Sequence, residues 1–231
     1  MAEIDFLLVE QETEEKHTRR IKRPVCETIQ WHGFFVQVHR IKEGWLYKPR
    51  HPYDYLKKQR EQGISLWTDK CLDGILKGYS QPFPTVEFAL FLLQNQPFRE
   101  IMILNGTKEN ENDRLWTRNF LEGSFAQLNG LYLCGNIQAE EAFLEYMYRE
   151  SGLLAVQTLK VPQADGKKCV YVDMNRNGTV DYKRIPQGCL YLDLTSSTEK
   201  QRCLALKRQD ISYVSARNYL DTALKVRYNA V

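Results

Sequence analysis

Two short and wholly apolar runs in the second half of the chain place the tightest limit on its fold. Residues 169–172 (CVYV) and 189–192 (CLYL) are each followed by an aspartate, Asp173 and Asp193 respectively. Apolar runs of this length, without polar alternation, are typical of strands that are buried on both faces. Their valine, leucine and tyrosine side chains favour strand over helix. The two runs therefore predict strands of a sheet that is covered on both sides.

Beyond residue 99, short apolar runs alternate with helical patterns of about a dozen residues. This alternation is typical of right-handed crossovers, which give a mostly parallel sheet with helices on both faces. We therefore expect a Rossmann-like or flavodoxin-like α/β fold for residues 99–231. The expected strands are 100–104, 128–134, 153–159, 169–172, 189–192 and 211–215, and the expected helices are 113–121, 138–150, 196–208 and 217–228.

Local residue patterns predict the ends of several of these helices. Ser196 and Glu199 match a capping box, in which the two residues satisfy each other's first-turn amide donors. Asp113 is suited to begin a helix, and Gly152 is suited to end one.

The first part of the chain lacks this rhythm, and we expect it to be less regular and mainly helical. Residues 31–41 alternate between apolar and polar side chains, which predicts a half-exposed strand. Residues 65–78 carry an apolar stripe at helical spacing, and Thr85 can cap a second helix.

A proline-bounded segment at residues 81–97 divides the chain into two expected parts, 1–98 and 99–231. The first part is locally basic, because residues 16–60 hold twelve lysines and arginines against three acids. Aromatic residues alternate with cations over residues 42–63, as on surfaces that bind single-stranded nucleic acid. An amphipathic helix has the same pattern, and we favour the helix. Nucleic-acid binding through residues 16–60 is the weaker alternative.

The composition is that of a globular protein, with 43% hydrophobic and 26% charged residues. No apolar run approaches the roughly 20 residues that a membrane helix needs. The acidic N-terminus does not match a secretory leader, and none of the six cysteines lies in a C-x-x-C pair. We therefore expect a cytoplasmic protein with reduced cysteines and no membrane association.

The motifs of several familiar chemistries are missing from the sequence. Neither the glycine loops G-x-G-x-x-G and G-x-x-x-x-G-K-[ST] nor the elbow G-x-S-x-G occurs. Residues 173–184 have the spacing of an EF-hand loop, but Arg184 stands where a bidentate glutamate is needed. We interpret this loop as a turn at Asn177-Gly178. The sequence predicts no metal ion, and it identifies neither a cofactor nor a catalytic residue.

Polar residues follow four of the expected strands, and they are the candidate ligand-binding residues: Asn105, Asn136, Asp173 and Asp193. In an open parallel sheet the carboxyl ends of the strands share one edge, where ligands usually bind. One interpretation is a site for Mg²⁺ or a ligand hydroxyl. The other, which we favour for the two aspartates, is that each accepts hydrogen bonds from its own loop.

The C-terminal third contains GCLYLDL at residues 188–194, then an expected helix and an aromatic strand, and then YLDTA at residues 219–223 with Lys225, Tyr228 and Asn229. This pattern resembles the end of a conserved protein family of clostridial-type anaerobic bacteria. The segment ESGLLA at residues 150–155 is similar as well. The resemblance implies a bacterial cytoplasmic protein. That family has no assigned activity, so it supplies no functional residues.

Taken together, these observations favour a non-catalytic α/β protein that acts as an interaction or accessory module, because no glycine loop, triad or metal cluster accompanies the fold. The alternative is a ligand-binding protein or Mg²⁺-dependent enzyme with its site at the strand carboxyl ends. A protein partner is consistent with the first interpretation, and neither the partner nor the ligand follows from the sequence.

Overall fold

In the computed structural model the chain forms two compact units, residues 1–81 and 82–231. The second unit begins before the helix at residues 86–94, whereas the sequence placed the division at residue 98. The described residues are 6–12, 25–31, 34–42, 65–68, 84–97, 99–106, 111–135, 137, 139–175, 180–195, 197–215 and 218.

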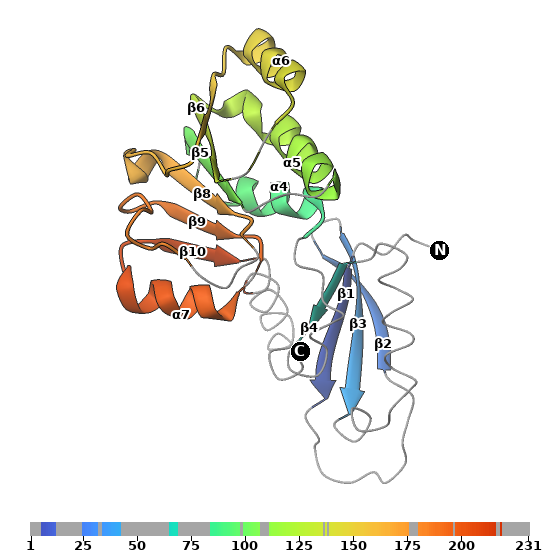
Figure 1. The fold of residues 1–231 in the computed structure, drawn as a ribbon. Helices are drawn as coiled ribbons and strands as arrows, with labels where there is room; N and C mark the ends of the chain where they lie inside the picture. Colours follow the sequence, from blue (N-terminus) through green and yellow to red (C-terminus); the bar gives the residue numbers. More distant parts are fainter. Residues whose placement is uncertain are drawn as a thin grey trace. The chain divides into compact units, whose positions relative to one another are not determined.

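The first unit contains a four-stranded sheet in the order β2-β3-β1-β4 (Figure 1). Strands β2 and β3 are antiparallel, while β1 runs parallel to both β3 and β4. The strand expected at residues 31–41 is confirmed as β3. The four strands are β1 (Phe6–Glu12), β2 (Val25–Trp31), β3 (Phe34–Lys42) and β4 (Ser65–Thr68).

In the expected first part, residues 1–98, the described residues form strands as far as Thr68 and then the helix at residues 86–94, which confirms the helix expected after Thr85. The helix expected over residues 65–78 is wrong at its start, because residues 65–68 pair with β1 as strand β4. A four-residue segment with Leu, Trp and Thr suits either structure, and pairing with a neighbouring strand decides between them. Residues 69–78 and most of the basic-aromatic stretch, 43–63, lie outside the described residues.

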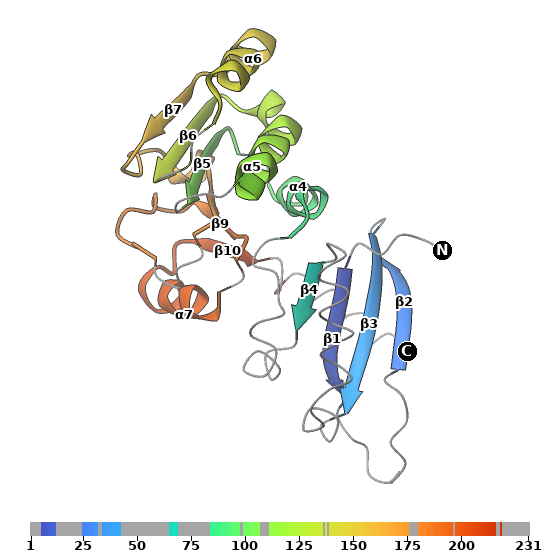
Figure 2. The ribbon, with the colours of Figure 1, turned by 45° about the vertical axis from the view of Figure 1, so that its right-hand side comes forward.

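The second unit contains a six-stranded, entirely parallel sheet in the order β10-β9-β8-β5-β6-β7 (Figures 1 and 2). Counted from β5 as the first strand, this is the order 3-2-1-4-5-6 of Rossmann folds, so the predicted fold class is confirmed. The strand order reverses between β5 and β8. The strands are β5 (Ile101–Gly106), β6 (Gly130–Gly135), β7 (Ala155–Thr158), β8 (Cys169–Asp173), β9 (Leu190–Asp193) and β10 (Ser212–Ser215).

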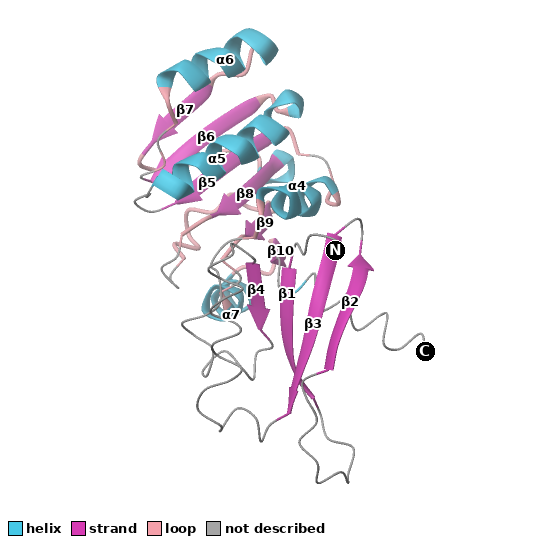
Figure 3. Ribbon diagram, turned by 90° about the vertical axis from the view of Figure 1, so that its right-hand side faces the viewer, coloured by secondary structure: helices cyan, strands magenta, loops and turns pink. Residues whose placement is uncertain are grey.

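Helices cover both faces of this sheet, with α4, α5 and α6 on one side and α7 on the other (Figure 3). The chain between β7 and β8 forms only a short 3₁₀ turn, Gly166–Lys168. None of the helices in the described part of the chain is long and apolar enough to cross a membrane. The helices are α4 (Val86–Gln94), α5 (Glu111–Ser124), α6 (Glu141–Ser151) and α7 (Thr198–Lys207).

The helix ends follow the predicted chemistry in two cases and depart from it in two. Thr85 caps α4 by accepting a hydrogen bond from the Phe88 amide at 3.3 Å, and Gly152 ends α6 with a left-handed φ of 71°. The predicted capping box is wrong, because Ser197 rather than Ser196 caps α7. Asp113 lies inside α5, which begins two residues earlier. The expected last helix, 217–228, falls outside the described residues except at position 218.

Alternate residues of the strands form two different cores, because side chains of a strand point to opposite faces in turn. On the α4 and α5 side the buried residues are aliphatic and aromatic, including Leu104, Val172, Leu192, Phe88 and Phe120. On the α7 side, one cluster joins three cysteines and two tyrosines to aliphatic side chains: Ile103, Cys134, Cys169, Tyr171, Ile185, Cys189, Tyr191 and Leu204.

Three tyrosines stack across neighbouring strands on the α7 side. Tyr171 of β8 pairs in register with Tyr191 of β9, which pairs with Tyr213 of β10. Their rings are stacked, with centroids 5.2 Å and 5.8 Å apart along the row. Cross-strand aromatic pairs of this kind stabilise a sheet and fix its register. We call these three side chains the tyrosine row.

The close approach of Gly166 to the chain that enters β9 gives a test of this packing. A Cβ at Gly166 would lie 1.9 Å from the carbonyl oxygen of Gln187. We expect Gly166→Ala to lower the free energy of unfolding by about 2–3 kcal/mol, because one backbone must move. Gly130→Ala is the control, since its Cβ has no described neighbour closer than 3.7 Å, and it should change stability by less than about 0.5 kcal/mol. Equal urea midpoints for the two variants would contradict this packing.

Candidate functional site

The structure brings Asp173 and Asp193 together at the carboxyl edge of the sheet. They end the adjacent strands β8 and β9 and are paired in register. Both lie on the α7 side, and their exposed fractions are 1% and 0%. Two buried carboxylates so close together need compensating charge, because burying an unpaired charge is very unfavourable.

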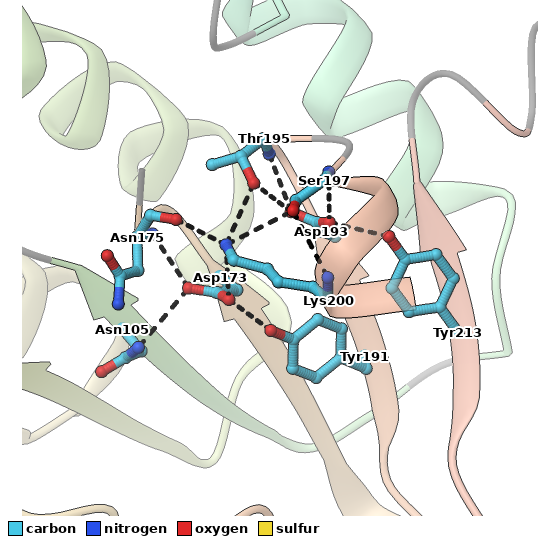
Figure 4. Close-up of polar contacts among 9 residues, drawn as sticks. All are labelled: Asn105, Asp173, Asn175, Tyr191, Asp193, Thr195, Ser197, Lys200 and Tyr213. Atoms are coloured by element: carbon cyan, nitrogen blue, oxygen red, sulfur yellow. Dashed lines mark hydrogen bonds and ion pairs between the residues drawn. The ribbon is translucent and has the colours of Figure 1, made fainter. Parts of the chain in front are cut away.

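That charge comes from Lys200, which is fully buried and whose ammonium points toward both carboxylates (Figure 4). Its Nζ lies 2.9 Å from Asp173 Oδ2 and 3.7 Å from Asp193 Oδ1. The ammonium also donates to Thr195 Oγ1 at 3.0 Å and to the carbonyl oxygen of Asn175. It therefore stands between the two strand ends, in the place where a bridging cation would be needed.

Local structure explains how a lysine reaches this position. Lys200 lies in the first turn of α7, and its own amide donates to the cap residue Ser197. Side chains of a helix lean toward its N-terminus, so that of Lys200 extends back over the ends of the strands. Its helical neighbour four residues on, Leu204, packs in the core cluster.

Every oxygen of the Asp193 carboxylate accepts hydrogen bonds. Oδ1 accepts from the Thr195 amide at 2.9 Å and from the Thr195 hydroxyl at 2.7 Å. Oδ2 accepts from the Ser197 amide at 2.9 Å and from the Tyr213 hydroxyl at 2.7 Å. The structure thus confirms that this aspartate accepts hydrogen bonds from its own loop.

The Asp173 carboxylate is engaged in the same manner. Oδ1 accepts from the Asn175 amide at 2.9 Å and, more weakly, from Asn105 Nδ2 at 3.4 Å. Oδ2 accepts from the Tyr191 hydroxyl in addition to Lys200. Loop amides, phenols and one ammonium together satisfy both carboxylates. We call this set the lysine–aspartate network.

The other two candidate residues stand differently. Asn105 is the last residue but one of β5, is half-buried, and lies beside Asp173 in the register of β5 and β8. It therefore occupies the point at which the strand order reverses. Asn136 lies outside the described residues. Of the four candidates, the structure thus joins three: Asn105, Asp173 and Asp193.

The glycines that end β5 and β6 have packing roles. A Cβ at Gly106 would lie 2.9 Å from the Ile137 side chain, and one at Gly135 would lie 2.3 Å from the Gly106 carbonyl oxygen. Gly135 also has a φ of 76°, which other residues rarely adopt. These glycines allow the two strand ends to approach each other.

The EF-hand-like spacing does not bring its acids to one point. Asp173 faces Lys200, and Asp181 forms an ion pair of 3.0 Å with Arg184, the residue that departs from the calcium motif. Residues 176–179 of that loop are outside the described part of the chain. Among the residues that are described, no group of three or more His, Cys, Asp or Glu side chains is placed to hold a metal ion.

The cysteines of the α7 side are free thiols within the core, as expected from their place in strands. Burial raises the pKa of Cys134 and Cys169 to about 11 and that of Cys189 to about 12. A thiol is nucleophilic only as the thiolate, so these three remain inert near neutral pH.

Comparisons of the chain with models of known protein families, with curated proteins and with solved structures found no match. The resemblance to a clostridial-type family therefore stays a prediction, and the function must be argued from the geometry itself.

Lys200 is the member of the lysine–aspartate network that the sequence did not reveal. A lysine in the first turn of a helix is usually solvent-exposed. A clue was present, because Lys200 and Leu204 share one helix face at i, i+4 spacing, and that face must meet the sheet.

Removing the ammonium should cost far more than removing a surface lysine. We expect Lys200→Met to lower the free energy of unfolding by about 3–5 kcal/mol, because it leaves two buried carboxylates without their cation. Lys207→Met, an exposed position of the same helix, should change it by less than about 0.5 kcal/mol. Urea unfolding measures both. Similar midpoints for the two variants would show that the lysine–aspartate network does not hold α7 on the sheet.

The tyrosines give the network a pH dependence. Burial raises the pKa of Tyr191 and Tyr213 above the ordinary value of 10, and the neighbouring carboxylates raise it further. A phenol whose pKa is raised by folding contributes stability that is complete below pH 10 and is lost at higher pH. We therefore expect the free energy of unfolding to fall above about pH 10. Tyr213→Phe should reduce that slope, and an unchanged slope in urea titrations from pH 8 upward would contradict this assignment.

Proposed function

We propose that the chain is a non-catalytic interaction or accessory module of the bacterial cytoplasm, built on a Rossmann-type sheet whose carboxyl edge is closed by its own lysine. The observation that carries this proposal is the position of Lys200 Nζ, 2.9 Å and 3.7 Å from the two carboxylates. An ion entering between Asp173 and Asp193 would have to displace a fully buried ammonium.

The surroundings of the carboxylates support the same conclusion. A general acid or base must come within hydrogen-bond reach of the substrate. Asp173 and Asp193 are buried, and their oxygens already accept bonds from amides and hydroxyls. The network thus has the features of a structural ion cluster, and a Rossmann fold by itself does not imply activity.

A second candidate function is favoured by the strand order. Open parallel sheets bind ligands where the order reverses, which here is between β5 and β8. Asn105 stands at that point, half-buried, and its side-chain amide donates a long bond of 3.4 Å to Asp173. This geometry supports a ligand-binding protein or a Mg²⁺-dependent enzyme. Nucleic-acid binding through residues 16–60 is a weaker alternative, and most of that stretch lies outside the described residues.

Thermal unfolding separates the first two candidates. With millimolar MgCl₂, ATP or NAD⁺, the melting temperature of the wild-type chain should stay unchanged, because Lys200 already fills the cation position. Lys200→Ala removes the ammonium and leaves space, so Mg²⁺ should raise the melting temperature of that variant by roughly 2–4 °C for each kcal/mol of binding energy.

The matched control is the variant Lys200→Ala with Asp173→Asn and Asp193→Asn, in which the gain from Mg²⁺ should disappear. A clear stabilisation of the wild-type chain by Mg²⁺ or a nucleotide would overturn the proposal. If Asn105→Ala then abolished that stabilisation, the ligand would be located at the reversal point of the sheet.

A further inference from the structure

A second polar region lies at the opposite end of the same sheet, where the strands begin. The loops that lead into β8, β9 and β10 enclose an open groove of about 670 Å³. It lies between residues 160–164 and 183–187. We call it the basic groove, because the charged residues among its described lining are the cations Lys160, Lys183, Arg184 and Arg208 and the acid Asp210.

One wall of the basic groove is held by the Arg208 side chain. Its guanidinium donates to the carbonyl oxygens of Tyr182, Ile185 and Pro186. It also forms two bonds of 2.8 Å to the carboxylate of Asp210. The same carboxylate accepts from the Gly188 amide at 2.8 Å. These bonds cross-link the loop before β9 to the start of β10, so the wall is preformed.

Some cations of the basic groove are paired with an acidic side chain and others are not. Arg208 and Asp210 neutralise each other, and the guanidinium strongly lowers the pKa of that carboxyl. Arg184 shares an exposed ion pair with Asp181. Lys160 and Lys183 are exposed, and within the described part of the chain neither has an acidic side chain within ion-pair distance. The groove therefore presents two uncompensated positive charges.

Apart from Gln163 and Gln187, the remaining lining residues are apolar, and part of this lining is anchored in the core. Val161, Ala164 and Ile185 pack against the core cluster of the α7 side, and two prolines stiffen the adjoining chain. Among the described residues, the lining contains no aromatic ring. Surfaces for single-stranded nucleic acid combine cations with rings on which bases stack, so this lining fits a peptide better than a nucleic acid.

We propose that the basic groove binds an acidic, extended segment of a protein partner. Carboxylates of the segment would meet Lys160 and Lys183, and small apolar side chains between them would contact Val161 and Pro162. This inference rests on the proposed function and deepens it, because it gives the interaction module a surface and the charge of its partner.

Fluorescence anisotropy with a labelled Glu-Ala repeat peptide tests the inference at low ionic strength. Wild-type chain should bind the peptide, and binding should weaken as salt screens the charges. Lys160→Glu with Lys183→Glu should weaken binding at least about tenfold, a change of about 1.4 kcal/mol. Arg149→Glu with Arg202→Glu reverses the same amount of charge at exposed positions outside the groove, and it should leave binding nearly unchanged.

A second measurement does not depend on variants. Acetylation of lysines, followed by mass spectrometry, should show protection of Lys160 and Lys183 by the peptide and none of Lys207. The inference is overturned if the peptide does not bind, if both double variants weaken binding equally, or if an oligothymidine binds more tightly and responds to the same variants. None of these outcomes depends on ligand-induced stabilisation, so failure of the groove and failure of the proposed function remain distinguishable.

Discussion

A single buried ammonium makes the second unit's sheet possible in its present form. Two adjacent strands end in aspartates that are almost completely excluded from solvent. Without Lys200, the attraction that offsets their desolvation would be lost while both charges stayed inside. Lys200 also fixes the position of α7 on the sheet. Its ammonium contacts Thr195 and the ends of the strands, while its amide donates to Ser197, the residue that caps the first turn of α7. The β9–α7–β10 connection is thus specified by charge as much as by apolar packing.

The tyrosine row links this charge to the core. Tyr191 and Tyr213 stack through their rings on the α7 side, and their hydroxyl groups donate to Asp173 and Asp193. Each phenol therefore has its apolar body in the cluster and its polar end in the network, which is how buried tyrosines are usually satisfied. A change in the core cluster should alter the lysine–aspartate network, and the reverse, because a shift of one tyrosine ring changes the geometry of its hydrogen bond to a carboxylate.

The sequence allowed the parallel sheet to be predicted, because whole strands such as residues 169–172 are apolar and alternate with helical patterns. It could not show that Asp173 would lie beside Asp193, since strand order depends on packing across the whole unit. The role of Lys200 was missed for the same reason: its burial follows from where α7 lies on the sheet. The error at residues 65–68 has another cause, which is that a short apolar segment takes its structure from its neighbour β1.

The two ends of the sheet differ in whether their charged side chains are buried or exposed, and this difference bears on how the protein recognises a partner. At the carboxyl edge, the two carboxylates of Asp173 and Asp193 share one ammonium, that of Lys200, and all three side chains are buried, so these charges face one another inside the fold. At the opposite end, Lys160 and Lys183 are exposed on a preformed wall. Exposed charges act mainly on the rate and selectivity of encounter and are weakened by salt, whereas buried pairs are screened far less. Recognition by this unit should therefore depend on ionic strength, whereas the stability contributed by its buried ion cluster should depend on it far less.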